Sequence, residues 1–541
     1  MKQDRHSGGP GSRQGEGRGP SSLARRAFLR KAALGLGGGL LATGLGLGGW
    51  RALARHAPPR PPAAPPNIIL LTADSLRADH VGAYGYARPT TPHLDRLAAE
   101  SVLFEYAFAP ISYTGPSLAS LHTGKYPQEH FMRFNNGKAP YLHTDPALAE
   151  LLKAHGYQTV AFVSNRLLER TRSQMDKGFD AYDDTLPDQR DDFGDIAARR
   201  SAPQTTAAVL QWLKTQAKPP FFLWVHYMEP HGPYAPPPPY NTLFVGDPLY
   251  RAEPRLLELS PEQRRGERIA REARVQGTTV TPRMVTYLDA TRDAARRVLH
   301  YNPRVADHIA RYDGEIRVLD EAVGHLLQAL KTQGLYDAAW LLFASDHGES
   351  LGERGYYFQH GRRVTLELLH VPLLIKPPGR TTPHRVGTQV GLIDLLPTLL
   401  EAVGIKQPAR LSGQSVLPLL RGERPKVPRP VFSELAFQFS LIDEKYQLLV
   451  GYDGPTYIEE GRRRLNVEFN AIPVSLFAYR SDPLGEKDLA GAERGIAEAR
   501  FREFRAFWDN YVKRTSRIAR VKRPPIKESA RTREILKQLG Y

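Results

Sequence analysis

The residues with the clearest chemical potential follow directly after a short apolar run. Residues 338–361 read AAWLLFASDHGESLGERGYYFQHG, so that the run Trp340–Ala344 gives way to Asp346 and His347, and a glycine-rich loop then leads to His360. A carboxylate beside an imidazole suits Mg, Ca, Mn or Zn as a ligand pair. The alternative is a strand that ends in a turn with a solvated Asp-His pair, and this stretch alone leaves both interpretations open.

A second carboxylate stands in the same relation to a second apolar run. Asn67–Ala73 has the composition of a buried strand, and Asp74 follows it. In open α/β sheets, ligands gather outside the carboxyl ends of the strands. We therefore expect Asp74, Asp346 and His347 to converge.

A hydroxyl is predicted at the start of a helix. Residues 114–117 read TGPS, and proline is favoured in the first turn of a helix. A hydroxyl at such a start faces unpaired N–H groups, where an anionic substrate would bind. Ordinary capping by Thr114 or Ser117 is the alternative.

Two further predicted strands lead into polar residues. Gln158–Ser164 precedes Asn165, and Pro220–Val225 precedes His226, after which His231 lies on a proline-rich loop. Each buried histidine could instead be a hydrogen-bonded core residue, an alternative that is stronger for His226 than for His231 or His360.

The elements that must position these residues are mostly of the α/β type. We predict a helix over 312–334, a strand over 371–375, a closing helix over 392–404 and a helical insertion over 241–305. Near residue 404 the sequence pattern changes to short β-like runs that alternate with turns. The tail from 501 forms a basic helix with an apolar face of Phe504, Phe507, Trp508 and Tyr511, which would either dock on the body or touch a membrane surface.

The positive charge is confined to the two ends of the chain. The 541 residues carry a net charge of +17, but residues 61–500 contain 51 basic and 51 acidic side chains. The body therefore lacks a basic field, which argues against nucleic acid as a partner. The chain has no cysteine, which excludes disulfides, thiolate metal sites and a cysteine nucleophile.

The N-terminal segment has the features of an export signal. Residues 1–22 have a composition that cannot form a core. Arg25 and Arg26 then precede a glycine-rich apolar run, a pattern typical of twin-arginine signals, and Ala52–Ala54 offers a cleavage site. An uncleaved anchor helix is the alternative. Either way, we expect the body to lie outside the cytoplasm, in the periplasm or anchored to the membrane and facing outward.

The ordered set of motifs resembles the sulfatase branch of the alkaline phosphatase superfamily. The matching pieces are NIILLTADSLRADHVGAYG, TTPHLDRLA, TGPSLASLHTGKYP, HYMEPHGPY, YDGEIRVLD, SDHGESLGERG and SDPLGEKDLAG, within residues 67 to about 490. The resemblance implies a doubly wound α/β sheet sandwiched by helices, with a smaller C-terminal α/β domain that carries an antiparallel sheet. Together with the features of the two ends, the predicted organisation is a disordered start and signal over 1–57, a proline-rich linker over 58–66, a catalytic domain over 67–403, a subdomain over 404–500 and a basic tail over 501–541.

The resemblance also assigns roles to individual residues. It implies one divalent metal ion, Mn, Zn, Mg or Ca, held by Asp74, Thr114, Asp346 and His347. Thr114 would also be the nucleophile. The remaining predicted contacts are with an anionic ester, through His231 and His360 as catalytic residues and through Asn165, His226 and Lys125 as binding residues.

The sequence departs from this family at the nucleophile. Similar sulfatases carry Cys or Ser in a Cys/Ser-x-Pro-x-Arg pattern, and it is converted to formylglycine, whereas here the two key positions are Thr114 and Leu118. Threonine cannot become that aldehyde, and a threonine ester must be broken by attack at sulfur or phosphorus, which matches phosphoryl transfer better. Ser75 stands where many sulfatases have a second acidic ligand, which puts calcium in doubt.

The sequence thus predicts a metal-dependent hydrolase of sulfate or phosphate esters. The alternatives are an envelope phosphotransferase of the phosphoethanolamine or glycerophosphate type, and a non-catalytic sulfatase-like binding protein.

Overall fold

A central eight-stranded sheet organises the chain. The computed structural model describes residues 65–133, 135, 146–187, 199–248, 305–379, 382–423, 429–435, 438–451 and 473–516. The predicted signal, most of the linker, most of the insertion over 241–305 and the end of the tail lie outside these residues. The sheet order is β12 (His384–Val386), β2 (Val102–Phe104), β11 (Leu373–Lys376), β7 (Ala339–Ser345), β1 (Asn67–Asp74), β6 (Phe221–Pro230), β4 (Gln158–Val163) and β5 (Ala181–Asp183).

Strand β1 lies at the centre of this sheet, between β6 and β7, and is parallel to both. Strand β11 alone runs antiparallel to its neighbours in this sheet among the described residues. The carboxyl ends of β1, β7 and β4 therefore open on one edge, as predicted.

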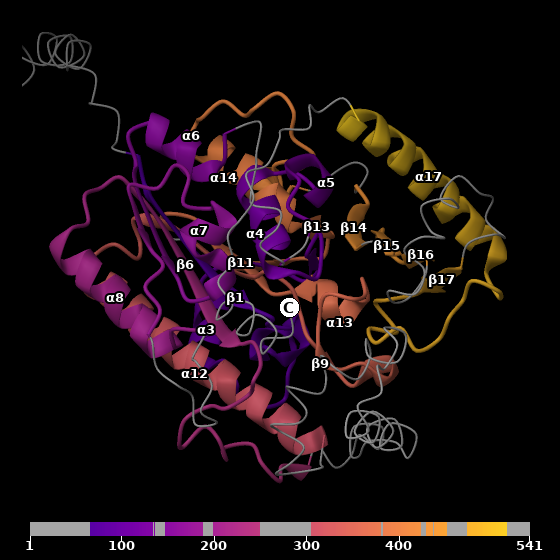
Figure 1. The fold of residues 1–541 in the computed structure, drawn as a ribbon, viewed down its shortest axis with the longest axis horizontal. Helices are drawn as coiled ribbons and strands as arrows, with labels where there is room; N and C mark the ends of the chain where they lie inside the picture. Colours follow the sequence, from indigo (N-terminus) through magenta and orange to yellow (C-terminus); the bar gives the residue numbers. More distant parts are fainter. Residues whose placement is uncertain are drawn as a thin grey trace, which may run out of the picture. The chain divides into compact units, whose positions relative to one another are not determined.

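The alternation of side chains along β1 separates two cores. Ile68 and Leu70 face one core, and Ile69 and Leu71 face the other. Helices cover both faces (Figure 1), which confirms the doubly wound sheet sandwiched by helices. On the first face lie α4 (Thr114–Thr123), α6 (Leu148–Ala154), α7 (Arg170–Ser173) and α14 (Leu395–Ala402), and on the second α3 (Pro92–Ala98), α8 (Ala202–Thr215) and α12 (Val305–Thr332).

Several short elements complete the first part of the chain. The run Val371–Ile375 was predicted as one strand, but Pro372 divides it between two sheets. The short strands are β3 (Ala107–Phe108), β10 (His370–Val371), β13 (Val390–Gly391), β8 (Ser350–Leu351) and β9 (Tyr357–Gln359), and the short helices are α5 (Pro127–His130), α13 (Leu366–Leu369) and α15 (Leu417–Leu420).

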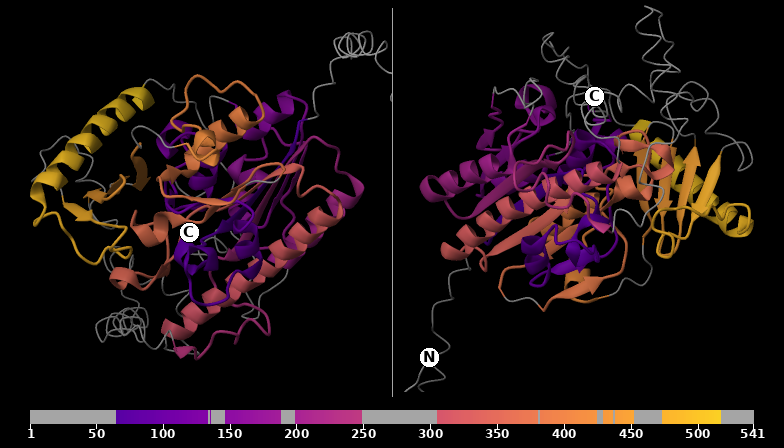
Figure 2. Two further views of the ribbon diagram at one scale, coloured as in Figure 1. Left: turned by 180° about the vertical axis from the view of Figure 1, so that it is seen from behind. Right: turned by 90° about the horizontal axis from the view of Figure 1, so that it is seen from below.

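The C-terminal part forms its own antiparallel sheet with one long helix against it (Figure 2). The sheet consists of β14 (Val431–Leu435), β15 (Gln438–Ile442), β16 (Gln447–Gly451) and β17 (Val474–Phe477), and the helix is α17 (Arg494–Ser516). The smaller domain with an antiparallel sheet, predicted from the resemblance, is confirmed.

The apolar face of α17 docks on this sheet and on α5. Phe504 and Tyr511 are buried, and Phe504 packs against Phe432 and Phe439. The Tyr511 hydroxyl donates to Glu434 and accepts a hydrogen bond from the Gln128 backbone N–H. The docking alternative therefore holds for this face, and membrane contact through it is not what the structure shows. None of the described helices is long and apolar enough to cross a membrane.

We expect Phe504→Ala to lower the free energy of unfolding by about 3–5 kcal/mol, because a fully buried aromatic ring is removed from a packed cluster. The measurement is the shift of the urea midpoint followed by circular dichroism. Arg502→Ala on the exposed side of the same helix is the control, and it should leave the midpoint unchanged. Equal effects of the two substitutions would contradict the docking.

Candidate active site

Two carboxylates meet at the carboxyl edge of the central sheet. Asp74 is the last residue of β1, and Asp346 directly follows β7. The Asp346 backbone N–H donates to the Ala73 carbonyl at 3.1 Å, which holds Asp346 beside the end of β1. The Asp346 Oδ1 accepts the backbone N–H groups of Ser75 (3.0 Å) and His347 (2.7 Å). Both carboxylates are completely buried. The predicted convergence of the two strand ends is therefore observed.

Thr114 lies between these carboxylates and His347. It begins α4 after the extended residue Tyr113, and its Oγ1 lies 3.4 Å from Asp74 Oδ2 and 3.3 Å from His347 Nε2. Ser117, in the same helical turn, donates its hydroxyl to the Asp346 carbonyl at 2.6 Å. This bond anchors the start of α4 to the end of β7.

The pKa values of the two carboxylates are shifted in opposite directions. Burial raises the pKa of Asp346 well above its ordinary value, and the charge of Asp74 adds to this rise. Burial alone would raise the pKa of Asp74 as well, but the imidazoles of His231, His347 and His226 hold it below its ordinary value. Among the described residues, no Lys or Arg pairs with either carboxylate, so only imidazoles balance them.

The donor atoms at this edge fit a divalent cation. One oxygen each from Asp74 and Asp346 and one nitrogen from His226 lie within 4.8 Å of one another. The Nε2 of His226 and the Oδ2 of Asp346 are buried without a hydrogen-bond partner among the described residues. His347 Nδ1 bonds the Gly348 carbonyl at 2.8 Å, so its Nε2 keeps the lone pair that a metal would need. Carboxylates, imidazoles and a hydroxyl are suitable ligands for such an ion.

His231 and His360 stand together beside this group. Their ring centroids are 5.0 Å apart, and the His360 ring lies 4.4 Å from that of His347. Burial lowers the pKa of His231 and brings the pKa of His360 to about 4. The His360 Nδ1 lies 3.1 Å from the Glu349 Oε1, and burial raises the pKa of this Glu349 to about 7. The resemblance did not assign a role to Glu349.

Two amides complete the surroundings of Thr114 and Asp74. The predicted Asn165 donates from Nδ2 to Asp74 Oδ2 at 2.7 Å. Asn135, which we did not predict, accepts the backbone N–H of Gly115 at 3.0 Å, while its Nδ2 is buried without a hydrogen-bond partner among the described residues. Asn135 lies in a stretch without periodicity, so no sequence pattern singled it out.

Two predicted contacts are placed differently from our expectation. The end predicted for the strand at Val225 is wrong, because β6 continues to Pro230 and His226 lies inside it, opposite Thr72 of β1. Its imidazole is grouped with the two carboxylates. Lys125 follows Gly124 at the far end of α4, about 16 Å from Thr114 along the helix axis, and the structure does not bring it to this group.

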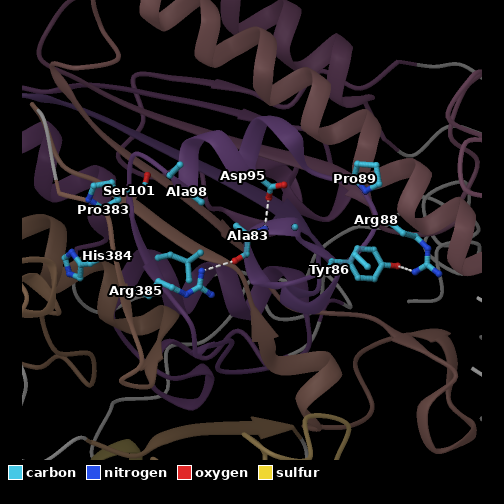
Figure 3. A pocket seen from close by; sticks show the side chains of 14 residues that line it. Ala83, Tyr86, Arg88, Pro89, Asp95, Ala98, Ser101, Pro383, His384 and Arg385 are labelled. Atoms are coloured by element: carbon cyan, nitrogen blue, oxygen red, sulfur yellow. Dashed lines mark hydrogen bonds between the residues drawn. The ribbon is translucent and has the colours of Figure 1, made fainter. Parts of the chain in front are cut away.

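A separate cavity of about 520 Å³ opens between the loop after β1, the end of α3 and β12 (Figure 3). Its cationic side chains are engaged with the protein: Arg88 donates to the Tyr86 hydroxyl at 2.7 Å, and Arg385 to the Ala83 carbonyl at 3.0 Å. None of the predicted site residues lines it, so it is distinct from the candidate active site.

Comparison with known proteins identifies the family. A sequence model of the family described as Sulfatase matches residues 66–405, well over half of the chain. The chain belongs to the sulfatase family. It is accordingly an enzyme, an ester hydrolase of that family, and the non-catalytic alternative is not favoured.

Relatives of this sulfatase-family chain differ in the activities they are named for. The multifunctional alkaline phosphatase superfamily protein PehA of Trinickia caryophylli is 26% identical over 79% of this chain and 91% of its own length. An N-acetylglucosamine-6-O-sulfatase of Bacteroides thetaiotaomicron is 24% identical over 66% of this chain and 71% of its own. The solved phosphonate monoester hydrolase of Silicibacter pomeroyi superimposes with a TM-score of 0.60 at 24% identity, covering 83% of this chain and 95% of that one, which confirms the fold.

Proposed function

We propose that the chain is a metal-dependent hydrolase in which Thr114 is the nucleophile, and that its substrates are phosphoric or phosphonic esters in preference to sulfate esters. The observation that carries the proposal is the position of the Thr114 hydroxyl at the start of α4, within 3.4 Å of both Asp74 and His347. An activated hydroxyl beside an anion-binding helix start is the arrangement that ester transfer requires.

The preference for phosphorus follows from the nucleophile. A threonine ester of sulfate or phosphate can be released only by attack at sulfur or phosphorus, whereas sulfatases with formylglycine expel sulfate from a geminal diol. The buried Leu118 stands where those enzymes have arginine, so the site also lacks that cation for its anion. A substrate with one negative charge, such as a phosphodiester or a phosphonate monoester, needs less compensation than a doubly charged phosphate monoester.

The reaction has two displacement steps. The Thr114 oxygen attacks phosphorus and loses its proton to water, and the bond to the ester oxygen breaks. His360 gives the proton on Nε2 to the departing alcohol and takes one at Nδ1 from Glu349, whose carboxyl lies 3.1 Å away and has a pKa raised to about 7. Water then attacks phosphorus and returns a proton to Glu349 through His360. The bond from phosphorus to Thr114 breaks as the Thr114 oxygen takes a proton from water, which restores the hydroxyl. A bound divalent cation would lower the pKa of that hydroxyl and neutralise charge on the ester.

The remaining side chains bind and orient the ester. His231 and the amides of Asn165 and Asn135 supply hydrogen-bond donors around the anion. Ser117 holds the helix start against Asp346, so that the hydroxyl of Thr114 is kept in line for attack. The name of the phosphonate monoester hydrolase agrees with the choice of a phosphonic ester as substrate.

The proposal is tested with the purified chain and a panel of 4-nitrophenyl substrates. The panel contains an aryl sulfate, a phosphate monoester, a phosphodiester and a phosphonate monoester, each with added Mn, Zn, Mg or Ca. We expect phosphodiester or phosphonate turnover to exceed sulfate turnover. Turnover of the sulfate alone would overturn the preference for phosphorus.

We expect His360→Asn to slow phosphodiesters with alkyl leaving groups by about 10²–10⁴-fold, because such oxygens need a proton as they depart. The 4-nitrophenyl ester needs no proton and should change far less. Glu349→Gln should produce the same dependence on the leaving group, more weakly, because it loosens the hold on His360 Nδ1. The measurement is kcat/KM across a series of leaving groups.

The control for this series is His370→Asn, whose ring bonds the Glu105 carbonyl away from the site. The His370 variant should leave the slope of log kcat/KM against leaving-group pKa unchanged. A His360 variant with the parent's slope would show that this histidine is not the proton donor.

A further inference from the structure

The buried imidazole of His226 lies beside the carboxylates of Asp74 and Asp346. His226 is fully buried in β6, and its Nε2 lies 3.5 Å from Asp74 Oδ2. Neither this nitrogen nor the Asp346 Oδ2 has a hydrogen-bond partner among the described residues. A buried donor or acceptor left unmatched costs about 1–3 kcal/mol, so both atoms need an explanation.

The other ring nitrogen of His226 lies beside the hydroxyl of Thr72, whose other hydrogen bonds restrict which of the two atoms can donate. The Thr72 Oγ1 accepts the Trp224 indole N–H at 3.0 Å, lies 3.0 Å from His226 Nδ1 and lies 3.3 Å from the Val225 carbonyl. Indole nitrogen can only donate, and the hydroxyl has one proton. If that proton goes to the Val225 carbonyl, His226 Nδ1 must donate to the hydroxyl, and Nε2 then keeps its lone pair.

The opposite arrangement is less favourable. If the hydroxyl donated to Nδ1, Nε2 would carry a proton and point it towards the carboxylates without reaching hydrogen-bond geometry. The arrangement with the lone pair becomes favourable once a cation lies between His226, Asp74 and Asp346. These three already present ligand atoms within 4.8 Å of one another.

We propose that His226 is a metal ligand, that Thr72 and Trp224 fix its tautomer, and that this second imidazole makes the site selective for Zn²⁺ over Ca²⁺ and Mg²⁺. The donor set is then two imidazoles, His226 and His347, with Asp74, Asp346 and the Thr114 hydroxyl. Ca²⁺ takes six to eight oxygen ligands and Mg²⁺ an octahedron of oxygens, whereas imidazole nitrogen favours Zn²⁺.

Ser75 supports this assignment. It stands where the resemblance expects another acidic ligand, but its hydroxyl donates to Asp74 Oδ1 at 3.0 Å. The cluster therefore has a hydroxyl where the resemblance expects a carboxylate, and His226 contributes an imidazole nitrogen to it. This inference rests on the proposed function only for the presence of a metal.

The test measures metal binding without substrate, so that its failure and a failure of the proposed hydrolysis are distinguishable. The full chain is stripped with a chelator and titrated separately with Zn²⁺, Mg²⁺ and Ca²⁺ by calorimetry. We expect Zn²⁺ to bind tightest, and His226→Gln to weaken Zn²⁺ binding by about 100-fold or more while Ca²⁺ affinity changes little. Thr72→Val should weaken Zn²⁺ binding by about 10–100-fold.

The matched control is His122→Gln. His122 is also buried and lies with its ring 4.4 Å from that of Trp224, but it is not in the ligand cluster. It should bind Zn²⁺ like the parent, and circular dichroism of the metal-free variants establishes that each is folded. Parent-like Zn²⁺ affinity in folded His226→Gln, or a parent that prefers Ca²⁺, would overturn the assignment. If His226→Gln does not fold, Thr72→Val replaces it in the test, and parent-like Zn²⁺ affinity in folded Thr72→Val would overturn the assignment.

Discussion

Thr114→Ala is expected to lower kcat/KM for the best phosphodiester or phosphonate substrate by about 10⁴-fold or more, because the atom that forms the covalent bond is removed. The methyl group that remains cannot attack, and positioning by the other residues supplies only the residual rate. The measurement is steady-state hydrolysis with saturating metal. Rapid acid quenching of the parent should also trap the phosphorylated Thr114 peptide for mass spectrometry.

Two variants separate the role of this hydroxyl from general damage to the site. Thr114→Ser keeps the oxygen and should retain most of the activity. Ser112→Ala removes a nearby hydroxyl that donates to the Arg363 carbonyl, and it should also be active. Hydrolysis that is unaffected in Thr114→Ala would remove Thr114 as nucleophile.

Asp346→Asn is expected to abolish both tight metal binding and activity, with kcat/KM lowered by about 10³-fold or more, since a bound cation contributes several kcal/mol to transition-state stabilisation. An amide oxygen can still accept the backbone N–H groups of Ser75 and His347, so the loop should keep its conformation. What disappears is the negative charge facing His347 and Asp74. The measurements are metal content after purification and kcat/KM.

Asp488→Asn is a matched control for this substitution. The Asp488 carboxylate also accepts two backbone N–H groups, those of Leu476 and Ala490, but it lies in the C-terminal part of the chain. It should keep full metal content and activity. An Asp346→Asn protein with the parent's metal content would contradict the proposed ligand set.

The sequence predicted the strand-end part of the site because apolar runs that stop abruptly mark both ends of a buried strand. Asp74 and Asp346 follow such runs, and the motif at Thr114 contains proline in a first turn. The place of His226 was harder to predict, because the polar residue after Pro220–Val225 was taken as the end of that strand. The alternation Phe222, Trp224, His226 on the face shared with Asp74 is the signal that could have revealed it.

Other features depend on contacts between distant segments that no local pattern encodes. Asn135 reaches the first turn of α4 across 20 residues of chain. The apolar face of the tail favoured docking over a membrane surface, but the sequence does not show that Phe432 and Phe439 are the residues on which it docks. Lys125 shares a motif with Thr114, but α4 lies between them, so that Thr114 begins the helix and Lys125 follows its far end.

The central place of β1 has a consequence for how the protein is made. Its partners are synthesised much later: Thr72 bonds the carbonyl of a residue 153 positions further on, and Ala73 accepts a bond from one 272 positions further on. At about 5–20 residues per second, a ribosome needs roughly 15–50 s to reach the second partner. Until the first of these partners is made, the uncharged run IILLTA has no neighbouring strand to pair with, so we expect spontaneous renaturation from denaturant to be slow and prone to aggregation.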